Sequence, residues 1–438
     1  MLLLPTDLYI TGGVLAVLAT VLLLVVLPPG PARAVFRPLP LLRFSPWPRP
    51  RLPLRLLTSA GSAGVLGLAL WAGRAGPRDP LANPLPLLVW TLFWIGLVTA
   101  QGVLGNHWRW TSPWVAPAAG LRWLLGRAPL RYPRRLGHLP ALAGFLGFAA
   151  ILLADIAPSD PARLAGYAGV YAAITLAGTA AFGTAWLVRG EALTVLMRAY
   201  ARIALVARDR GRLAIGLPGW RVLRGPQMPL SLALFCVVLL GTGSFDGLNE
   251  TFWWFARIGI NPLEFPGRSA VIGSSLGGLA LANVALVAIF AATLRLGLWL
   301  ARADMTTGAA FRLFAPSLLP IALGYHLAHY LTAALVEAQY ALAVLNDPLA
   351  RGANLLGLGR FYVTTGFFNE QGSVRAIFLT QAGAVVLGHV LAILLAHALA
   401  LRALGSPRRA VLSQAPLALF MIAYTLFGLW LLASPRGL

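Results

Sequence analysis

The sequence of 438 residues contains no lysine, a single cysteine and few charged residues of either sign. Charged residues make up 11% of the chain and apolar residues 58%, which is more apolar surface than a soluble protein of this length can bury. The single cysteine, Cys236, excludes disulfides within the chain and thiolate metal clusters. Histidine, carboxylate, tyrosine and methionine therefore remain as candidate metal ligands, and the composition predicts a polytopic membrane protein.

Several catalytic motifs are also missing. The sequence has no Walker A motif, no H-E-x-x-H and no C-x-x-C-H. ATP-driven transport, zincin-type proteolysis and covalent attachment of c-type haem therefore lack their usual marks. Because no loop between apolar runs is long enough for an independent core, the sequence predicts no soluble catalytic domain.

Apolar runs suitable for crossing a bilayer occur at ten places. Two of them, near 57–72 and 139–156, are shorter than the ~20 residues that a crossing normally needs. The pattern predicts an all-α fold, with residues 1–438 forming one transmembrane domain of about ten spans. The predicted spans lie near 8–28, 57–72, 84–105, 139–156, 164–188, 228–245, 269–294, 313–337, 376–401 and 413–433.

All 35 basic residues are arginines, and the formal net charge is +22. They concentrate in alternate loops, 29–56, 106–138 and 189–227, which the positive-inside rule places in the cytoplasm. The segments 246–268 and 338–375, together with both termini, are then predicted to be periplasmic. This alternation favours binding to anionic lipid and gives no continuous basic face for nucleic acid. We expect the protein in a bacterial inner membrane.

Four of the six histidines lie in two apolar runs, 313–337 and 376–401. Ionisable groups in a bilayer are costly, which makes them candidates for function. At 1.5 Å per residue, His326, His329 and His389 fall at similar depth if the two helices pair. Three imidazoles at one depth suit zinc, copper or non-haem iron, and two of them facing each other suit b-type haem. Hydrogen bonding between helices is the purely structural alternative.

Two further polar residues follow His329 in the same run. At about 100° per residue, Tyr330 and Glu337 lie on nearly the same helix face as His326. Glu337 is predicted to be a general base or a fourth metal ligand, and Tyr330 a donor to a leaving oxygen. His397 falls near the inner interface and is interpreted as a boundary residue.

An acidic cluster follows the run at 228–245. Asp246, Asn249 and Glu250 precede the aromatic residues 252–255. This pattern is typical of a solvated loop above an aromatic anchor in the interface. A cation site or the cap of a re-entrant turn is the alternative.

Four segments resemble one family. NPLPLLVWTLFWIGL at 83–97, SFDGLNETFWW at 244–254, GYHLAHY at 324–330 and GHVLAILLAH at 388–397 are similar to segments of bacterial integral membrane proteins labelled fenitrothion hydrolase-like. The resemblance implies hydrolysis of an organophosphate triester. Ala398 stands where relatives carry an acidic residue, so no role of the preceding histidine is implied.

Three functions are thus predicted in order. The first is metal-assisted hydrolysis of an apolar phosphotriester, with His326, His329 and His389 as ligands of zinc or copper. The second is a haem- or metal-binding subunit of a redox complex that anchors a periplasmic protein partner through 246–268 and 338–375. The third is a secondary transporter, for which the sequence shows no clear inverted repeat.

Overall fold

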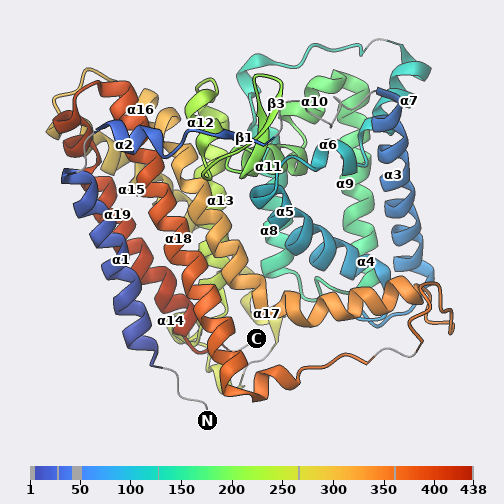
Figure 1. Cartoon of the computed structure of the whole chain (residues 1–438). Helices are drawn as coiled ribbons and strands as arrows, with labels where there is room; N and C mark the ends of the chain where they lie inside the picture. Colours follow the sequence, from blue (N-terminus) through green and yellow to red (C-terminus); the bar gives the residue numbers. More distant parts are fainter. Residues whose placement is uncertain are drawn as a thin grey trace. The chain divides into compact units, whose positions relative to one another are not determined.

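A computed structural model describes residues 5–26, 29–41, 52–126, 128–264, 267–359 and 362–436. The described chain is almost wholly helical (Figure 1), which confirms the all-α prediction. Parts of several predicted loops lie outside the described residues: 42–51 of the loop 29–56, 127 of the loop 106–138, 265–266 of the segment 246–268, and 360–361 of the segment 338–375.

Nine helices in the described ranges are long and apolar enough to cross a membrane. They match nine of the ten predicted spans. The remaining run, 139–156, forms α8 (Leu139–Ala154), whose 16 residues reach only about 24 Å. The run near 57–72 becomes the 24-residue helix α3 (Leu52–Ala75), because the helix continues past the polar residues that bound the apolar run. A hydropathy pattern locates such a helix but underestimates its length.

Contacts divide the chain into two compact units. Unit 1 comprises 1–41, 202–329 and 368–438, and unit 2 comprises 42–201 and 330–367. The long helix α17 (Leu319–Asn346) contributes its first part to unit 1 and its second part to unit 2. The prediction of a single transmembrane domain stays a prediction.

Unit 1 is a bundle centred on α13 (Leu230–Asn249), which is buried along most of its length. The start of α1 lies beside the end of α19, since a Cβ on Gly13 would meet the side chain of Leu429. The start of α1 and the end of α19 therefore lie at the same end of this unit (Figure 1). The periplasmic location of the two termini stays a prediction. Besides α13 and α17, unit 1 contains α1 (Thr6–Val26), α2 (Pro29–Ala34), β1 (Leu39–Pro40), β2 (Val206–Asp209), β3 (Arg212–Ile215), α12 (Trp220–Arg224), α14 (Phe252–Arg257), η3 (Pro262–Glu264), η4 (Arg268–Val271), α15 (Ile272–Leu300), α16 (Thr307–Phe314), η5 (Ala315–Leu318), α18 (Gln371–Leu404) and α19 (Pro407–Ala433).

The helices that carry the membrane histidines, α17 and α18, touch through their backbones within unit 1. A Cβ on Gly324 would lie 2.5 Å from the carbonyl oxygen of Ala384, and one on Gly388 would lie 2.7 Å from that of Pro320. Glycine is needed on both sides because any side chain would hold the helices apart. The close pairing of these two helices, on which the depth argument depended, is present.

A small antiparallel sheet stands out in this helical chain. β2 and β3 form a hairpin in which Val206 pairs with Ile215, and β1 adds to the other edge of β3. The turn is made by Arg210 and Gly211, whose φ angles of 47° and 86° are both positive, as a type I′ hairpin turn requires. The hairpin lies in what the sequence predicts to be the cytoplasmic loop 189–227, and β1 lies in the predicted cytoplasmic loop 29–56.

Unit 2 packs short helices around α3, α9 (Pro161–Phe182) and the third span, Pro84–Val103. The central part of this span, η1 (Leu87–Leu97), is a π-helix. Buried Gln101 ties the end of this span to its surroundings, since its Nε2 donates to the carbonyl of Met197 at 2.8 Å. Unit 2 also contains α4 (Pro84–Pro86), α5 (Val98–Val103), α6 (Trp108–Thr111), α7 (Val115–Leu125), η2 (Arg134–Leu136), α8, α9 (Pro161–Phe182), α10 (Thr184–Arg189) and α11 (Ala192–Tyr200); η6 (Gly366–Asn369) lies at the boundary of the units.

A buried carboxylate begins α11. Glu191 is the N-cap residue, and its oxygens accept hydrogen bonds from the backbone N–H groups of Leu193 and Thr194 and from the hydroxyl of Tyr171. Burial is the main influence and raises the pKa of Glu191, while these hydrogen bonds act in the opposite direction. The folded protein therefore holds a proton on this carboxyl more tightly than the unfolded chain does.

Candidate metal centre

Two carboxylates lie one helical turn apart at the end of α13. Asp246 is in the last turn and Glu250 is the C-cap residue, so their side chains project from the same face. Asn249, the third polar residue of this cluster, points elsewhere, because its Oδ1 accepts a hydrogen bond from Ser275 on α15. The helix thus presents a pair of carboxylates, whereas the amide between them serves packing.

A histidine from α17 faces this pair. Nε2 of His329 lies 3.3 Å from Oδ2 of Asp246. The nearest ligand atoms of Asp246, Glu250 and His329 all lie within 4.8 Å of one another. Among the residues that the structure describes, this is the one group of three or more His, Cys, Asp or Glu side chains with such spacing. All three residues belong to unit 1.

An arginine borders the group. Nη1 of Arg436 lies 3.5 Å from Oε2 of Glu250 and 3.5 Å from Nδ1 of His329. The segment that carries it is fixed to the end of α13, since the backbone N–H of Phe252 donates to the carbonyl of Pro435 at 3.0 Å and Thr251 forms a β-bridge with Arg436. A positive charge is therefore held beside the carboxylates by backbone hydrogen bonds.

Burial and charge act on Glu250 in opposite directions. Burial has the largest effect and raises the pKa of the Glu250 carboxyl. The charges of His329 and Arg436 lower it, while the carboxylate of Asp246 raises it again. The carboxyl at the edge of the group thus takes up a proton more readily than an exposed glutamate.

The donor set fits a small divalent ion. Two ligands at 2.0–2.1 Å from a tetrahedral ion lie ~3.3 Å apart, which is the spacing of the His329 and Asp246 atoms. The position of Arg436 opposes binding, because its positive charge beside Nδ1 favours the tautomer with the proton on Nε2. Nε2 must lose that proton to become a ligand. A metal ion and the guanidinium of Arg436 therefore compete for this group.

The three predicted histidine ligands do not form one donor group in the structure. His329 joins the carboxylates, whereas His326 and His389 are buried elsewhere in unit 1. Nδ1 of His389 lies 2.9 Å from the carbonyl oxygen of Val385 on its own helix, and its ring packs between Tyr325 and Tyr424 at centroid distances of 6.4 and 6.2 Å. The ring is thus oriented by α18 itself and by two aromatic neighbours. A three-histidine ligand set stays a prediction.

The predicted catalytic residues Tyr330 and Glu337 lie in unit 2. Oε2 of Glu337 accepts a hydrogen bond from Thr91 at 2.6 Å, and the ring of Tyr330 meets Trp94 edge-on at 6.1 Å. Both partners are on the π-helix η1, a rare conformation that often occurs at functional sites. The catalytic roles of these two residues stay predictions. His397, interpreted as a boundary residue, is buried in the last part of α18.

The sequence offered a signal for part of the observed group. Asp246 and Glu250 have the i, i+4 spacing of one helix face, and a cation site is one of the two alternatives to the solvated loop that their cluster favours. Their connection with His329 is not predicted, because the depth argument groups His329 with His326 and His389. Nothing in the sequence indicated Arg436, which reaches the site through backbone contacts far along the chain.

Comparison of the chain with protein-family models, with curated proteins and with solved structures finds no match. The resemblance to fenitrothion hydrolase-like membrane proteins, and the haem-binding and transporter alternatives, stay predictions.

Proposed function

We propose that this polytopic membrane protein binds a divalent transition-metal ion, with zinc preferred, through Asp246, Glu250 and His329. The observation that carries the proposal is the convergence of their ligand atoms within 4.8 Å of one another. Acidic and imidazole side chains are energetically costly within a membrane, so those that occur there are candidates for function. Carboxylate oxygens and imidazole are both ligands of zinc, and the group contains none of the thiolate or thioether ligands that select copper(I).

The proposed reaction is hydrolysis of an apolar phosphotriester. A site with three protein ligands keeps a position open for substrate, and a zinc ion held there would polarise a phosphoryl oxygen. Arg436, once displaced from Glu250, offers guanidinium donors suited to phosphoryl oxygens. Asp246 orients His329 through the contact at Nε2 before the ion binds. The sequence resemblance supports this choice of reaction.

Metal content and variants test the binding step. Protein purified in detergent should carry close to one zinc per chain by elemental analysis, and His329→Ala or Asp246→Asn should lose most of it. His389→Ala and His326→Ala are matched controls, since each removes a buried histidine of the same unit outside the group. Equal metal in the His329→Ala and His389→Ala proteins would contradict the proposed ligands.

Two further measurements on the same sample address the chemistry. Release of the aryl alcohol from an aryl dialkyl phosphotriester by the zinc-loaded protein, and its loss in His329→Ala, would support the hydrolytic reaction. Absence of release from a fully zinc-loaded sample would contradict it. A Soret band in the visible spectrum would instead favour the haem-binding subunit.

A further inference from the structure

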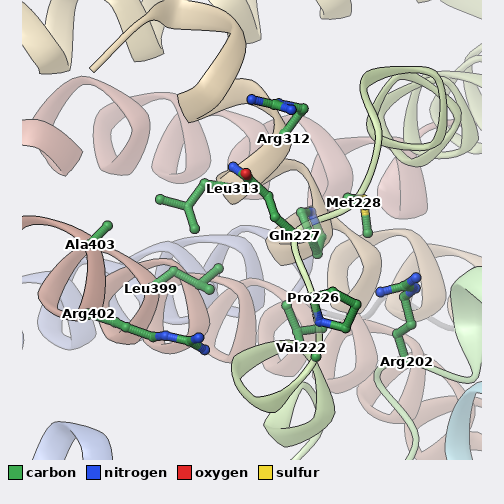
Figure 2. A pocket seen from close by; sticks show the side chains of 12 residues that line it. Arg202, Val222, Pro226, Gln227, Met228, Arg312, Leu313, Leu399, Arg402 and Ala403 are labelled. Atoms are coloured by element: carbon green, nitrogen blue, oxygen red, sulfur yellow. The ribbon is translucent and has the colours of Figure 1, made fainter.

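A pocket of about 180 Å³ lies in unit 1 where α16, α18 and the segment before α13 meet. Three arginines border it, Arg202, Arg312 and Arg402, each from a different part of the chain. Figure 2 shows them on three sides of the pocket, with Gln227 between them. None of the lining residues that the structure describes is Asp or Glu. The pocket therefore gathers positive charge without a carboxylate in its wall.

The charged residues around the pocket also indicate a positive electrostatic potential there. Burial and then the charge of Arg202 lower the pKa of Arg221, which lies on α12 outside the spans. Asp209, the acidic residue of the adjacent hairpin, forms an ion pair with Arg224. Arg402 donates to the carbonyl of Leu223, which fixes its guanidinium near the pocket. Like charges held together in this way favour an anion between them.

The rest of the wall is apolar. Apolar side chains from three helices and from the segment before α13 complete the wall: Val222, Leu313, Leu399 and Met228. A site for a free inorganic ion has no need of such a surface, whereas a headgroup attached to acyl chains does. At ~30 Å³ per water, the volume equals about six waters, which is room for a phosphate group.

The pocket and the candidate metal centre lie at opposite ends of α13. Met228 of the pocket precedes the first residue of this helix, and Glu250 of the metal centre follows its last. The 20 residues of α13 span about 30 Å, which is the thickness of the hydrocarbon core. A helix of this length across a membrane would place the pocket at the level of the lipid headgroups, on the face opposite the metal centre.

We propose that the pocket bordered by Arg202, Arg312 and Arg402 binds a phosphate group, supplied by the headgroup of an anionic phospholipid. Guanidinium groups form paired hydrogen bonds to phosphate oxygens, and basic pockets between membrane helices are known lipid sites. Arg202 and Arg312 are half-buried, so their charges are less screened than those of exposed arginines. This site is independent of the metal centre.

The test uses the full chain in a neutral detergent with phosphatidylglycerol as the probe. Native mass spectrometry counts bound lipid in the wild type and in the double variant Arg202→Gln, Arg312→Gln. The matched control is Arg408→Gln, Arg409→Gln, which removes two exposed arginines next to the end of α18. We expect at least a tenfold loss of bound lipid in the pocket variant and less than a twofold change in the control. Equal lipid in both variants would overturn the proposal.

A second variant guards against a folding defect. Leu399→Trp fills the pocket and leaves every arginine in place, so it should also lose the lipid while eluting as the wild type does. Retention of the lipid by this variant would overturn the proposal. Inorganic phosphate, titrated by calorimetry in lipid-free protein, separates the two sources of phosphate. Tight binding that displaces phosphatidylglycerol supports a phosphate site but overturns the headgroup as its source; weak binding supports the lipid.

Discussion

Asp246 and His329 face each other across two helices, with Oδ2 of the aspartate 3.3 Å from Nε2 of the histidine. Both side chains are about nine-tenths shielded from solvent, so each supplies a polar partner that the bilayer cannot. The pair joins α13 to α17. The same two atoms have the separation of two ligands of a tetrahedral ion, so two of the three proposed ligand atoms are already placed for metal binding.

Removal of Arg436 should strengthen metal binding. In Arg436→Gln the competing positive charge is lost and Nδ1 of His329 is free to carry the proton, so the affinity for zinc should rise on the order of tenfold. Competition titration with a chromophoric chelator measures it. Arg257→Gln is the control, because Arg257 is exposed on the neighbouring helix α14. A weaker affinity in Arg436→Gln would show that Arg436 supports the ion and does not compete with it.

The contact between α17 and α18 should tolerate no side chain at Gly324. The added Cβ of Gly324→Ala meets the backbone of Ala384, which cannot move aside as a flexible side chain can. The cost should be about 1–3 kcal/mol of stability. Gly383→Ala, on α18 but with open space around the new methyl group, should change little. Unfolding in a denaturing detergent compares the two, and equal stabilities would argue against the close approach.

Stability should fall with rising pH through Glu191. Because burial raises its pKa in the folded state, the folded protein holds this proton more tightly than the unfolded chain does. The resulting stabilisation is fully present below the unfolded pKa and is lost as pH rises through the folded one. Glu191→Gln should remove that part of the pH dependence of Tm, whereas Glu370→Gln, at an exposed site, should leave it unchanged. An unaltered profile in Glu191→Gln would assign the dependence to another group.

Reporter fusions test the membrane orientation. A reporter inserted within 205–225 should be cytoplasmic and one within 350–358 periplasmic, because arginines concentrate in alternate loops. Paired fluorescent-protein and alkaline-phosphatase fusions measure both sides. A periplasmic signal from 205–225 would reverse the orientation and would place the metal centre on the cytoplasmic face.

Helix positions were predictable from this sequence, but side-chain partnerships were less so. The length of an apolar run indicates whether a segment can cross the hydrocarbon core of a bilayer. This criterion located nine of the helices that are long and apolar enough to cross a membrane. Apolar length cannot show that η1 is a π-helix, because α-helices and π-helices are built from similar residue types. The hairpin depends on positive φ angles at Arg210 and Gly211. A single glycine in an arginine-rich loop is not enough to predict such a turn.

The candidate site was predictable by half. His329 is a predicted ligand because an imidazole in a membrane helix is costly. Asp246 and Glu250 belong to an acidic cluster for which a cation site is only an alternative to a solvated loop. Grouping the histidines with one another assumed that side chains at one depth point toward the same space. The ring of His389 is oriented by the carbonyl of Val385 and by Tyr325 and Tyr424, and these contacts do not follow from the sequence.

The order of synthesis gives the C-terminal arginine a further consequence. His329 precedes Arg436 by 107 residues, so a ribosome adding roughly 5–20 residues per second needs about 5–20 s to pass from one to the other. During that interval the two carboxylates and the imidazole already exist, while their tethered competitor does not. An ion captured by the nascent chain meets no guanidinium, whereas an ion that arrives after release of the chain must displace one. Metal supply during translation and metal supply afterwards should therefore load this protein to different extents.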